Sequence, residues 1–515
     1  MAVHQTALVV SLTAPTTAGM LLGMADAAAG RADMAELRLD CLARRDAKTL
    51  GDLIEHRPLP VIVTCRPVRQ GGRYEGPEAA RLALLAEAAR LGAEYVDVED
   101  DVPASDWPAA KVIVSHHDFR GRPADLDKLV KELAAGPAAV VKVAFAAAGP
   151  EDALAALAAV RGCAKPAMVI AMGECGVASR ILAPKVGAFG TFASLEAGAE
   201  SAPGQAPLAT MKGMYRWDSI SPATQVFGVV GCPVAQSLSP VTHNAFLAGE
   251  KMDAVYVPLR VEPSQADFAR FLRAVREAAW ADVRGLSVTI PHKEHALAAV
   301  GAESVDELSR RIGAINTVRL DAAGRLRGWN TDYAGAIDAL CEGMGIRRDE
   351  LSGRHVAVLG AGGAARAVVA GLDHYGAIIT IYNRTLARAA ELAGDFGADA
   401  RPLADLPQLR AEVLINCTSI GMYPRVDESP VPEAVLPRVS VVFDTVYNPV
   451  RTLLLRQAAE AGCRTVGGLD MFLRQAEAQF ELWTGRAPSG AGVTAAIQRQ
   501  FDQLEHLRVA RASRP

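Results

Sequence analysis

Short apolar runs alternate regularly with amphipathic stretches through the first 215 residues of the chain. Runs of this length predict buried strands, and the Ala/Leu-rich stretches at 77–91, 125–133 and 151–160 have the spacing of helices. Strand–helix alternation predicts a parallel sheet, and eight such units in roughly 200–250 residues predict an N-terminal (βα)8 barrel. The predicted strands are 7–13, 35–39, 60–65, 94–98, 111–115, 139–145, 167–172 and 188–193.

The pattern changes around residues 217–222, where a second series of strands and helices begins. A strongly apolar strand at 354–359 runs into a Gly/Ala-rich turn and then into an Ala/Val-rich helix, which is typical of a nucleotide-binding lobe. We expect a helix at about 471–483 to pack back on the lobe that comes first. The other predicted strands are 226–230, 254–259, 285–290, 317–320, 378–382, 413–416 and 441–444.

These changes divide the chain into two α/β parts. We predict the barrel over residues 1–218 and a two-lobed dehydrogenase over 219–515. Within the second part, a substrate lobe is expected at about 222–332 plus 472–505, and a Rossmann-like nucleotide lobe at about 333–471.

Composition excludes several classes of protein. Hydrophobic residues make up 50% and charged residues 22%, the balance of a globular protein, and only the tail 508–515 is expected to be disordered. A formal net charge of −4 gives no basis for a nucleic-acid partner. No apolar run approaches the ~18 residues of a membrane helix, so we expect no membrane partner.

The eight cysteines include no CxxC pair, which argues against a disulfide framework and against structural zinc. His292 and His295 follow a proline and lack a third ligand, so we interpret them as a non-metal pair. The N-terminus lacks the basic flank of a signal peptide, and the cytoplasm is the expected compartment. The oligomeric state is left open.

Charged residues at the ends of the predicted barrel strands are the first sign of an active site. Parallel strands are buried on both faces and normally form continuous apolar runs, so charged exceptions need an explanation. In a (βα)8 barrel the carboxyl ends of the strands meet at one mouth, which carries the active site. The exceptions are Glu36, Arg38, Asp40, Arg66, Asp97, Glu99, His117, Asp118 and Lys142.

Lys142 lies inside the apolar run Val140 to Phe145. A buried ammonium tends to lose its proton, and the neutral amine is a nucleophile for ketones. The alternative is a lysine that reaches from the strand end to a carboxylate. His117 could shuttle protons beside a Schiff base, or it could be a hydrogen-bonded structural histidine.

A second group of polar residues suits an anionic ligand. Arg180 follows the predicted seventh strand, and the loop 201–205 follows the eighth, a common anion-binding position in these barrels. Arginine with hydroxyl, amide and backbone donors would bind a carboxylate. The arginine could equally form a surface ion pair.

Together these motifs resemble type I 3-dehydroquinate dehydratase over essentially the whole first half. The matching segments are 36–40, Arg66, 97–99, 115–119, 142–144, 179–180 and 201–205. The resemblance implies that Lys142 forms an imine with the ring ketone and that His117 moves the proton. The residues it implies for binding or orienting substrate are Glu36, Arg38, Arg66, Asp97, Arg180, Ser201 and Gln205. One position departs, since Gln70 stands where the family usually carries Glu before a Gly-Gly pair.

The segment Gly360 to Ala365 fits GxGxxA between a strand and a helix, where glycines let backbone N–H groups approach a pyrophosphate. The next predicted strand ends in Asn383, Arg384 and Thr385, with Arg388 one turn on. An NAD enzyme would place an acidic residue there, whereas a basic cluster accommodates a 2′-phosphate, so we predict NADP. The alternative is an ordinary solvated basic turn.

Further motifs in the second half are Ser-x-Ser at 237–239, residues 288–293, 316–317, 330–332, 416–422, 444–449 and 467–476. Together they resemble shikimate dehydrogenase over about 222–500. The resemblance implies that Lys293 and Asp332 are the catalytic pair, which suits proton supply to a developing alkoxide. The implied substrate-binding residues are Ser237, Ser239, Thr289, Asn316, Tyr447 and Gln475. The implied NADP-binding residues are Gly360, Ala361, Gly362, Gly363, Ala364, Ala365, Asn383, Arg384, Thr385, Arg388 and Met471.

The two resemblances predict consecutive reactions. The first would dehydrate 3-dehydroquinate to 3-dehydroshikimate, and the second would reduce that product to shikimate. The order resembles the fused plant enzymes, without a transit-peptide-like extension ahead of the barrel. One alternative is that the second half prefers quinate. The other is a non-catalytic regulator that binds pathway metabolites, which the retained lysines, histidine and aspartate disfavour.

Overall fold

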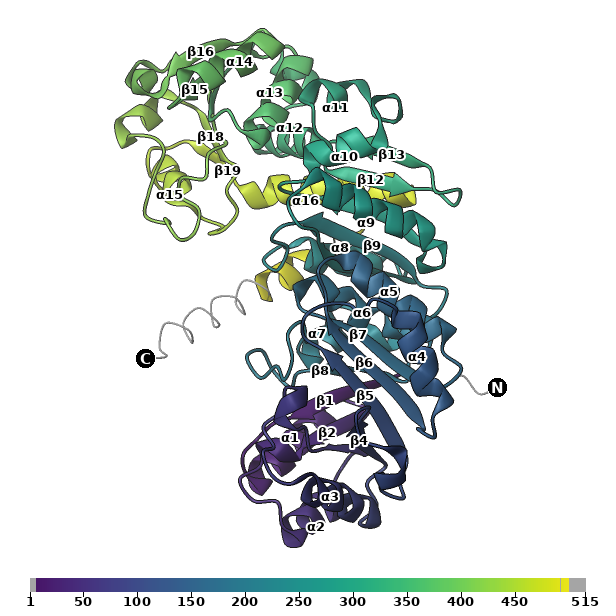
Figure 1. Cartoon of the computed structure of the whole chain (residues 1–515). Helices are drawn as coiled ribbons and strands as arrows, with labels where there is room; N and C mark the ends of the chain where they lie inside the picture. The colour runs from purple at the N-terminus through teal and green to yellow at the C-terminus, as the bar shows by residue number, and fades with distance from the viewer. Residues whose placement is uncertain (1–5, 491, 500–515) are drawn as a thin grey trace. The chain divides into compact units, whose positions relative to one another are not determined.

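The computed structural model describes residues 6–490 and 492–499. The chain divides into two compact units, 1–283 and 284–515, which are described separately (Figure 1). The predicted disordered tail at 508–515 and the last part of the predicted substrate lobe, 500–505, lie outside the described residues. Within the described part, no helix combines the length and apolar character needed to span a bilayer.

The first unit begins with an eight-stranded barrel in which every pair of neighbouring strands is parallel. The strand order is β7-β6-β5-β4-β3-β2-β1-β8, and the Phe189 N–H donates to the Ala167 carbonyl at 2.9 Å where β7 meets β8. All eight predicted strands are confirmed with small shifts at their ends. Their bounds are β1 Ala7–Leu12, β2 Met34–Arg38, β3 Val61–Thr64, β4 Tyr95–Glu99, β5 Val112–Asp118, β6 Val140–Ala146, β7 Ala167–Met172 and β8 Gly190–Ala193.

Helices follow the barrel strands and cover the sheet from outside (Figure 1). Some of them begin at a capping side chain, as where Asp125 accepts the Lys128 N–H at 2.9 Å. Inside the barrel, Val9, Ile62, Ile113 and Met168 belong to one apolar cluster. The helices are α1 Thr17–Ala29, α2 Ala47–Glu55, α3 Glu78–Arg90, α4 Leu126–Ala135, α5 Pro150–Gly162, α6 Val177–Ile181 and α7 Leu208–Gly213.

The first unit also contains the start of the predicted substrate lobe: β9 Gln225–Gly231, α8 Ser239–Gly249, β10 Ala254–Arg260 and α9 Gln265–Glu277. These elements pack on the barrel. Arg270 on α9 pairs with Glu151 on α5 at 2.6 Å, and the Lys185 ammonium donates to the Thr224 carbonyl at 2.6 Å. The compact unit therefore extends to residue 283. The predicted boundary at 218/219 separates the two enzymes in the sequence rather than two compact units of the structure, and it stays a prediction.

The second unit contains an antiparallel ladder of β11, β12 and β13 and a separate six-stranded parallel sheet of order β16-β15-β14-β17-β18-β19. The strands are β11 Val283–Val288, β12 Thr317–Leu320, β13 Leu326–Trp329, β14 His355–Leu359, β15 Ile378–Asn383, β16 Asp399–Pro402, β17 Val413–Asn416, β18 Val441–Asp444 and β19 Arg464–Val466. The sequence pattern missed β13, β16 and β19. They are three- or four-residue edge strands with exposed positions, and they carry too few apolar residues to stand out.

The helices of the second unit are α10 Lys293–Val300, α11 Glu307–Ile312, α12 Thr331–Met344, α13 Gly363–His374, α14 Leu386–Phe396, α15 Leu453–Glu460 and α16 Gly468–Thr484. Helix α16, expected at 471–483, packs along α12 (Figure 1). Its buried face includes Met471, Gln475 and Gln479, and Gln479 accepts from Ser287 of β11 at 2.7 Å. The helix is thus joined to the substrate-lobe strands, as predicted.

Two candidate active sites

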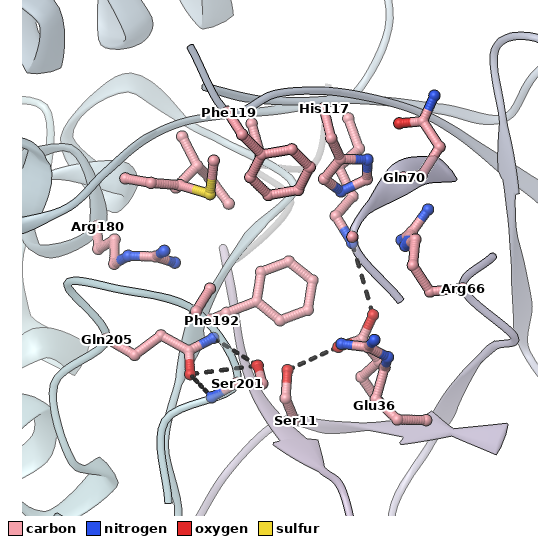
Figure 2. Close-up of a pocket in the computed structure, with 17 residues that line it drawn as sticks. Ser11, Glu36, Arg66, Gln70, His117, Phe119, Arg180, Phe192, Ser201 and Gln205 are labelled. Atoms are coloured by element: carbon pink, nitrogen blue, oxygen red, sulfur yellow. Dashed lines mark hydrogen bonds and ion pairs between the residues drawn. The ribbon is translucent and has the colours of Figure 1, made fainter. Parts of the chain in front are cut away.

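The barrel mouth holds a polar pocket into which strands far apart in the sequence direct their side chains (Figure 2). The predicted residues that line it are Glu36, Arg38, Arg66, Gln70, His117, Lys142, Arg180, Ser201 and Gln205. Asp97 does not line the pocket but is fully buried and bound to Lys142. The structure therefore brings the predicted catalytic and substrate-binding residues of the barrel to one place, whereas Asp118, also named from the strand ends, lies outside the pocket and 3.7 Å from Arg120.

Lys142, on β6, is 5% exposed. Its ammonium nitrogen lies 2.9 Å from Asp97 Oδ2, 3.5 Å from Glu36 Oε1 and 4.5 Å from the centre of the Phe192 ring. Burial opposes charge on both carboxylates, but the neighbouring cations outweigh it and hold the pKa of Asp97 and of Glu36 below the usual range. The lysine does pair with carboxylates, yet it does so inside the pocket rather than by reaching to solvent.

His117, on β5, lies beside Lys142 and Asp97. Its Nδ1 is buried without a hydrogen-bond partner among the described residues, and its ring stacks on Phe119 with centroids 6.2 Å apart. Burial, followed by the charges of Arg66 and Lys142, lowers the pKa of His117 well below 6.5. The imidazole is therefore neutral near pH 7 and able to accept a proton.

Hydroxyl groups that sequence reasoning missed complete this cluster. The Ser11 hydroxyl donates to Glu36 Oε2 at 2.6 Å, and the Thr64 hydroxyl donates to Glu36 Oε1 at 2.9 Å. The Ser115 hydroxyl donates to Asp97 Oδ1 at 2.6 Å. Serine and threonine inside an apolar strand do not break its pattern, so no signal distinguished them.

Arg180, on α6, is 3% exposed and faces no carboxylate among the described residues. Its Nε has no partner there, and its Nη2 makes one long contact of 3.5 Å with the Pro203 carbonyl. Burial lowers the pKa of Arg180 to about 10. The predicted alternative of a surface ion pair is therefore wrong, and a buried cation without an anion suits an anionic ligand.

Four other residues line the pocket: Ser201, Gln205, Gln70 and Arg38. The Gln205 amide donates to the Ser201 hydroxyl at 3.0 Å, and Figure 2 shows both across the pocket from Arg66 and Gln70. Gln70, the residue that departs from the family, has a buried Oε1 without a partner among the described residues. Arg38 is held by Asp40 through bonds of 2.8 and 3.0 Å.

The second unit holds the other predicted pair. Lys293 is the first residue of α10, and its ammonium donates to Asp332 Oδ2 at 2.5 Å. Asp332 lies in the first turn of α12, where the N-terminal helix dipole favours a carboxylate. Neither side chain is fully buried, so the pair can reach a ligand.

Buried amides hold this pair in place. Asn316 donates to Asp332 Oδ1 at 2.8 Å and lies 3.4 Å from Gln475 Oε1. Thr289 lies in the connection from β11 to α10. Tyr447 packs on Phe472 of α16, with ring centroids 5.5 Å apart. Ser237 and Ser239 belong to the first unit, where the Ser239 N–H at the start of α8 donates to the Ser237 hydroxyl at 3.2 Å.

The Gly360–Ala365 turn connects β14 to α13 in the second unit. Gly360 has φ +104°, and a Cβ there would lie 3.2 Å from the Cys417 carbonyl oxygen, so only glycine suits the turn. Gly362, Gly363 and Ala364 leave the N-terminus of α13 exposed for a pyrophosphate. These features fit a dinucleotide.

The end of β15 and the turn after it carry the residues expected to bind the ribose and 2′-phosphate of that dinucleotide. Asn383 donates to the Thr385 carbonyl at 2.9 Å, which shapes the turn into α14. Arg384 and Arg388 are exposed and form no ion pair within the described part of the chain. Guanidinium groups that form no ion pair among the described residues fit a 2′-phosphate. Met471, the predicted nicotinamide contact, is buried on α16.

Family models match in the order predicted. The type I 3-dehydroquinase model matches residues 8–222, and the substrate-binding domain of shikimate dehydrogenase matches 229–318. The model of shikimate/quinate 5-dehydrogenase matches 345–445, and the shikimate 5′-dehydrogenase C-terminal domain matches 468–498. Four models thus cover both predicted parts.

Individual relatives agree. The chain is 40% identical to the bifunctional 3-dehydroquinate dehydratase/shikimate dehydrogenase, chloroplastic, of Arabidopsis thaliana, over 88% of this chain and 78% of that protein. It is 44% identical to shikimate dehydrogenase (NADP(+)) of Methanocella arvoryzae, over 51% of this chain and 94% of that protein. A solved shikimate 5-dehydrogenase of Thermus thermophilus in complex with NADP(H) and shikimate is 37% identical, with a TM-score of 0.48, over 54% of this chain and all of that one. Over both its halves, the chain belongs to the family of bifunctional type I 3-dehydroquinate dehydratases/shikimate dehydrogenases.

Proposed function

We propose that the two sites carry out consecutive reactions: the barrel dehydrates 3-dehydroquinate to 3-dehydroshikimate, and the second half reduces that product to shikimate with NADPH. The observation that carries the proposal is the buried Lys142, held by Asp97 and Glu36 beside a neutral His117. Arg180, a buried cation that pairs with no carboxylate among the described residues, supplies the site for the substrate carboxylate.

In the barrel, Lys142 gives up a proton and its neutral amine attacks the ring ketone; that proton returns to the former carbonyl oxygen, which leaves as water as the iminium forms. The resulting iminium acidifies the adjacent C–H, and His117 removes that proton because its imidazole is neutral. His117 then returns a proton to the departing hydroxyl, which leaves as water. Hydrolysis of the imine releases the product and restores Lys142. Asp97 and Glu36 keep the lysine oriented throughout.

In the second half, NADPH supplies a hydride when bound. Lys293 protonates the alkoxide oxygen that develops on the ketone carbon, and Asp332 holds the lysine for that transfer. Asn316 fixes Asp332 from behind. Residues Gly360–Ala365, Asn383, Arg384, Thr385 and Arg388 bind NADP, and Thr289, Tyr447 and Gln475 contact the substrate. The roles of Ser237 and Ser239 stay predictions from the resemblance.

The domain boundary near residue 219 and a cytoplasmic location are part of the proposal. The dehydroquinase match ends at 222 and the next begins at 229, which supports the boundary. All eight cysteines are free thiols, as in a reducing compartment. Cell fractionation with an antibody to the chain tests the location, and recovery in another compartment would refute it.

A coupled assay tests both activities at once. Purified chain given 3-dehydroquinate and NADPH should form shikimate with equal loss of NADPH. Borohydride added with 3-dehydroquinate should reduce the imine and leave an adduct on Lys142, which peptide mass spectrometry locates. Lys142→Ala should abolish dehydration and adduct formation while reduction of added 3-dehydroshikimate continues. An adduct on another lysine would overturn the barrel mechanism, and turnover of quinate in preference to shikimate would favour the alternative substrate.

A further inference from the structure

A chain of alternating charges runs from Lys142 away from the pocket. Asp97 binds Lys142 on one side and Arg66 on the other, at 2.9 Å in both cases. Arg66 Nη1 lies 2.7 Å from Glu99 Oε1, and the other oxygen of Glu99 lies 2.6 Å from Arg81 Nη1. Arg81 is on the outer helix α3 and does not line the pocket.

Every charge in this chain is buried. Lys142, Arg66 and Arg81 are 5%, 4% and 0% exposed, while Asp97 and Glu99 are both 0% exposed. Glu36, 3% exposed, also binds Lys142, so within the buried cluster three cations face three carboxylates, while the partly exposed Glu78 also binds Arg81. Loss of Arg81 would leave one uncompensated negative charge in a buried cluster. Such a charge is costly, and the cluster would respond by taking up a proton.

We propose that Arg81 is a positioning residue for the dehydratase reaction: by pairing with one oxygen of Glu99, it keeps this carboxylate in place for Arg66, so that Arg66 does not draw Asp97 away from Lys142. The inference rests on the proposed dehydratase function. Arg66 stands between two carboxylates, Asp97 and Glu99, and a neutral Glu99 would leave it to bind Asp97 alone. Arg66 would then compete with Lys142 for Asp97, the group that orients the nucleophile. The contact from Arg81 Nη1 to the Cys65 carbonyl, at 3.0 Å, fixes the backbone just before Arg66.

Glu99 is the member of the cluster poised to take up that proton. The pKa of Glu99 lies above its usual range, because burial and the nearby charge of Asp97 outweigh the lowering by Arg66 and Arg81. Cys65 and Ser115 also face this region, but the pKa of Cys65 is raised to about 12 by burial, and a serine hydroxyl does not titrate here. Glu78 is the second carboxylate of Arg81, at 2.6 Å, and is partly exposed. Loss of Arg81 removes one of the two cations that keep Glu99 charged.

The test is the pH profile of kcat/KM for dehydration in Arg81→Met. A glutamate that has lost its cation is protonated at higher pH, so the acid limb should move up by about one pH unit or more. At pH values on the acid side of the shifted limb, kcat/KM of Arg81→Met should be about 10–100-fold lower than that of the wild type, the scale of a misplaced catalytic group. At higher pH it should approach the wild-type value. Arg81→Lys should restore the acid limb, because lysine keeps the charge.

Two other variants separate this role from a structural one. Arg90→Met is the matched control, since Arg90 is exposed on the same helix and pairs with Glu87 at 2.6 Å. It should leave the profile unchanged. Glu99→Gln cannot ionise and should lower kcat/KM at every pH, which provides a readout if Arg81→Met does not fold. Reduction of 3-dehydroshikimate by the same preparations reports on folding.

The outcomes are distinct. An Arg81→Met profile that keeps the wild-type shape, even with a lower melting temperature, would overturn the positioning role, as would an unchanged kcat/KM in Glu99→Gln. Failure of the wild-type chain to dehydrate 3-dehydroquinate would instead overturn the proposed function itself.

Discussion

Individual side chains at the barrel mouth are defined by what surrounds them more than by their type. Lys142 and Arg180 are both buried cations, yet Lys142 contacts two carboxylates, whereas Arg180 contacts none in the described part of the chain. The first arrangement holds a nucleophile in place, and the second leaves a positive charge for a ligand. His117, with burial and two nearby cations, is a base rather than a cation near pH 7.

The lowered pKa of His117 predicts the acid limb of dehydration. The histidine acts as base only when neutral, and its pKa in the folded chain lies well below 6.5. As pH falls through 6.5, kcat/KM should therefore stay level, and it should decline only at lower pH. The measurement is kcat/KM against pH, because this ratio reports the free enzyme. An acid limb at 6.5 or above would contradict the assignment of His117 as a buried neutral base.

Lys293→Met should lower kcat for reduction of 3-dehydroshikimate by about 10²–10⁴, the usual contribution of a positioned acid. The dissociation constant for NADPH should barely change, because Lys293 starts α10 and the nucleotide turn lies between β14 and α13. Steady-state kinetics and fluorescence titration of NADPH measure the two effects. A large loss of NADPH affinity with kcat preserved would show that the lysine has another role.

Secondary-structure elements explain why these side chains converge. Parallel strands place the residues after their carboxyl ends at one edge, so β2, β5 and β6 direct Glu36, His117 and Lys142 into one pocket. In the second unit, Asp332 and the Gly360–Ala365 turn both lie at helix N-termini, which attract negative charge. The helix dipole stabilises the carboxylate of Asp332 in the first case and would stabilise a bound pyrophosphate in the second.

The turn from β15 to α14 predicts the choice of cofactor. Arg384 and Arg388 can form charge-assisted hydrogen bonds to a 2′-phosphate, each worth about 1.5–3 kcal/mol. Two partly exposed bonds should favour NADPH over NADH by about 10²–10⁴, since 1.4 kcal/mol is tenfold. Arg384→Asp should weaken use of NADPH far more than use of NADH. The comparison requires kcat/KM for both cofactors at fixed ionic strength, and equal use by the wild type would refute this role of the turn.

The chain as a whole joins its parts through contacts that domain families do not reveal. Within the first unit, α9 of the dehydrogenase lobe packs on α5 of the barrel, through the Arg270–Glu151 pair. The Arg161 guanidinium also lies 4.8 Å from the centre of the Trp280 ring. The barrel is therefore stabilised by elements that belong to the second enzyme by homology.

This packing predicts the behaviour of a fragment. Residues 1–221 contain the complete barrel and all its pocket residues, so the fragment should dehydrate 3-dehydroquinate. Its melting temperature should be lower than that of a fragment ending at 283, because it lacks α9 and the contacts of Thr224 and Trp280. Thermal unfolding followed by circular dichroism compares the two fragments. Equal melting temperatures would show that the packing contributes nothing to stability.

Local patterns in the sequence determined the order of the main strands and helices, the barrel, the nucleotide turn and the charged residues at the barrel strand ends. These features depend on periodicity and on charged residues that interrupt apolar runs, and both are local properties. The roles of individual site residues came from the family resemblance and stay predictions. The missed strands β13, β16 and β19 are short edge strands stabilised by pairing with a neighbour, which leaves little local signal.

Only the tertiary structure decided which partner each buried group has. Ser11 meets Glu36, and Arg81 meets Glu99, across 25 and 18 residues of chain. Arg180 has no carboxylate partner within residues 6–490 and 492–499, although its sequence context allowed a surface ion pair. The compact unit that ends at 283 rather than 218 is a result of the same kind. Burial and pairing depend on residues that come together only on folding, and together these two properties raise the pKa of Glu99 and lower that of His117.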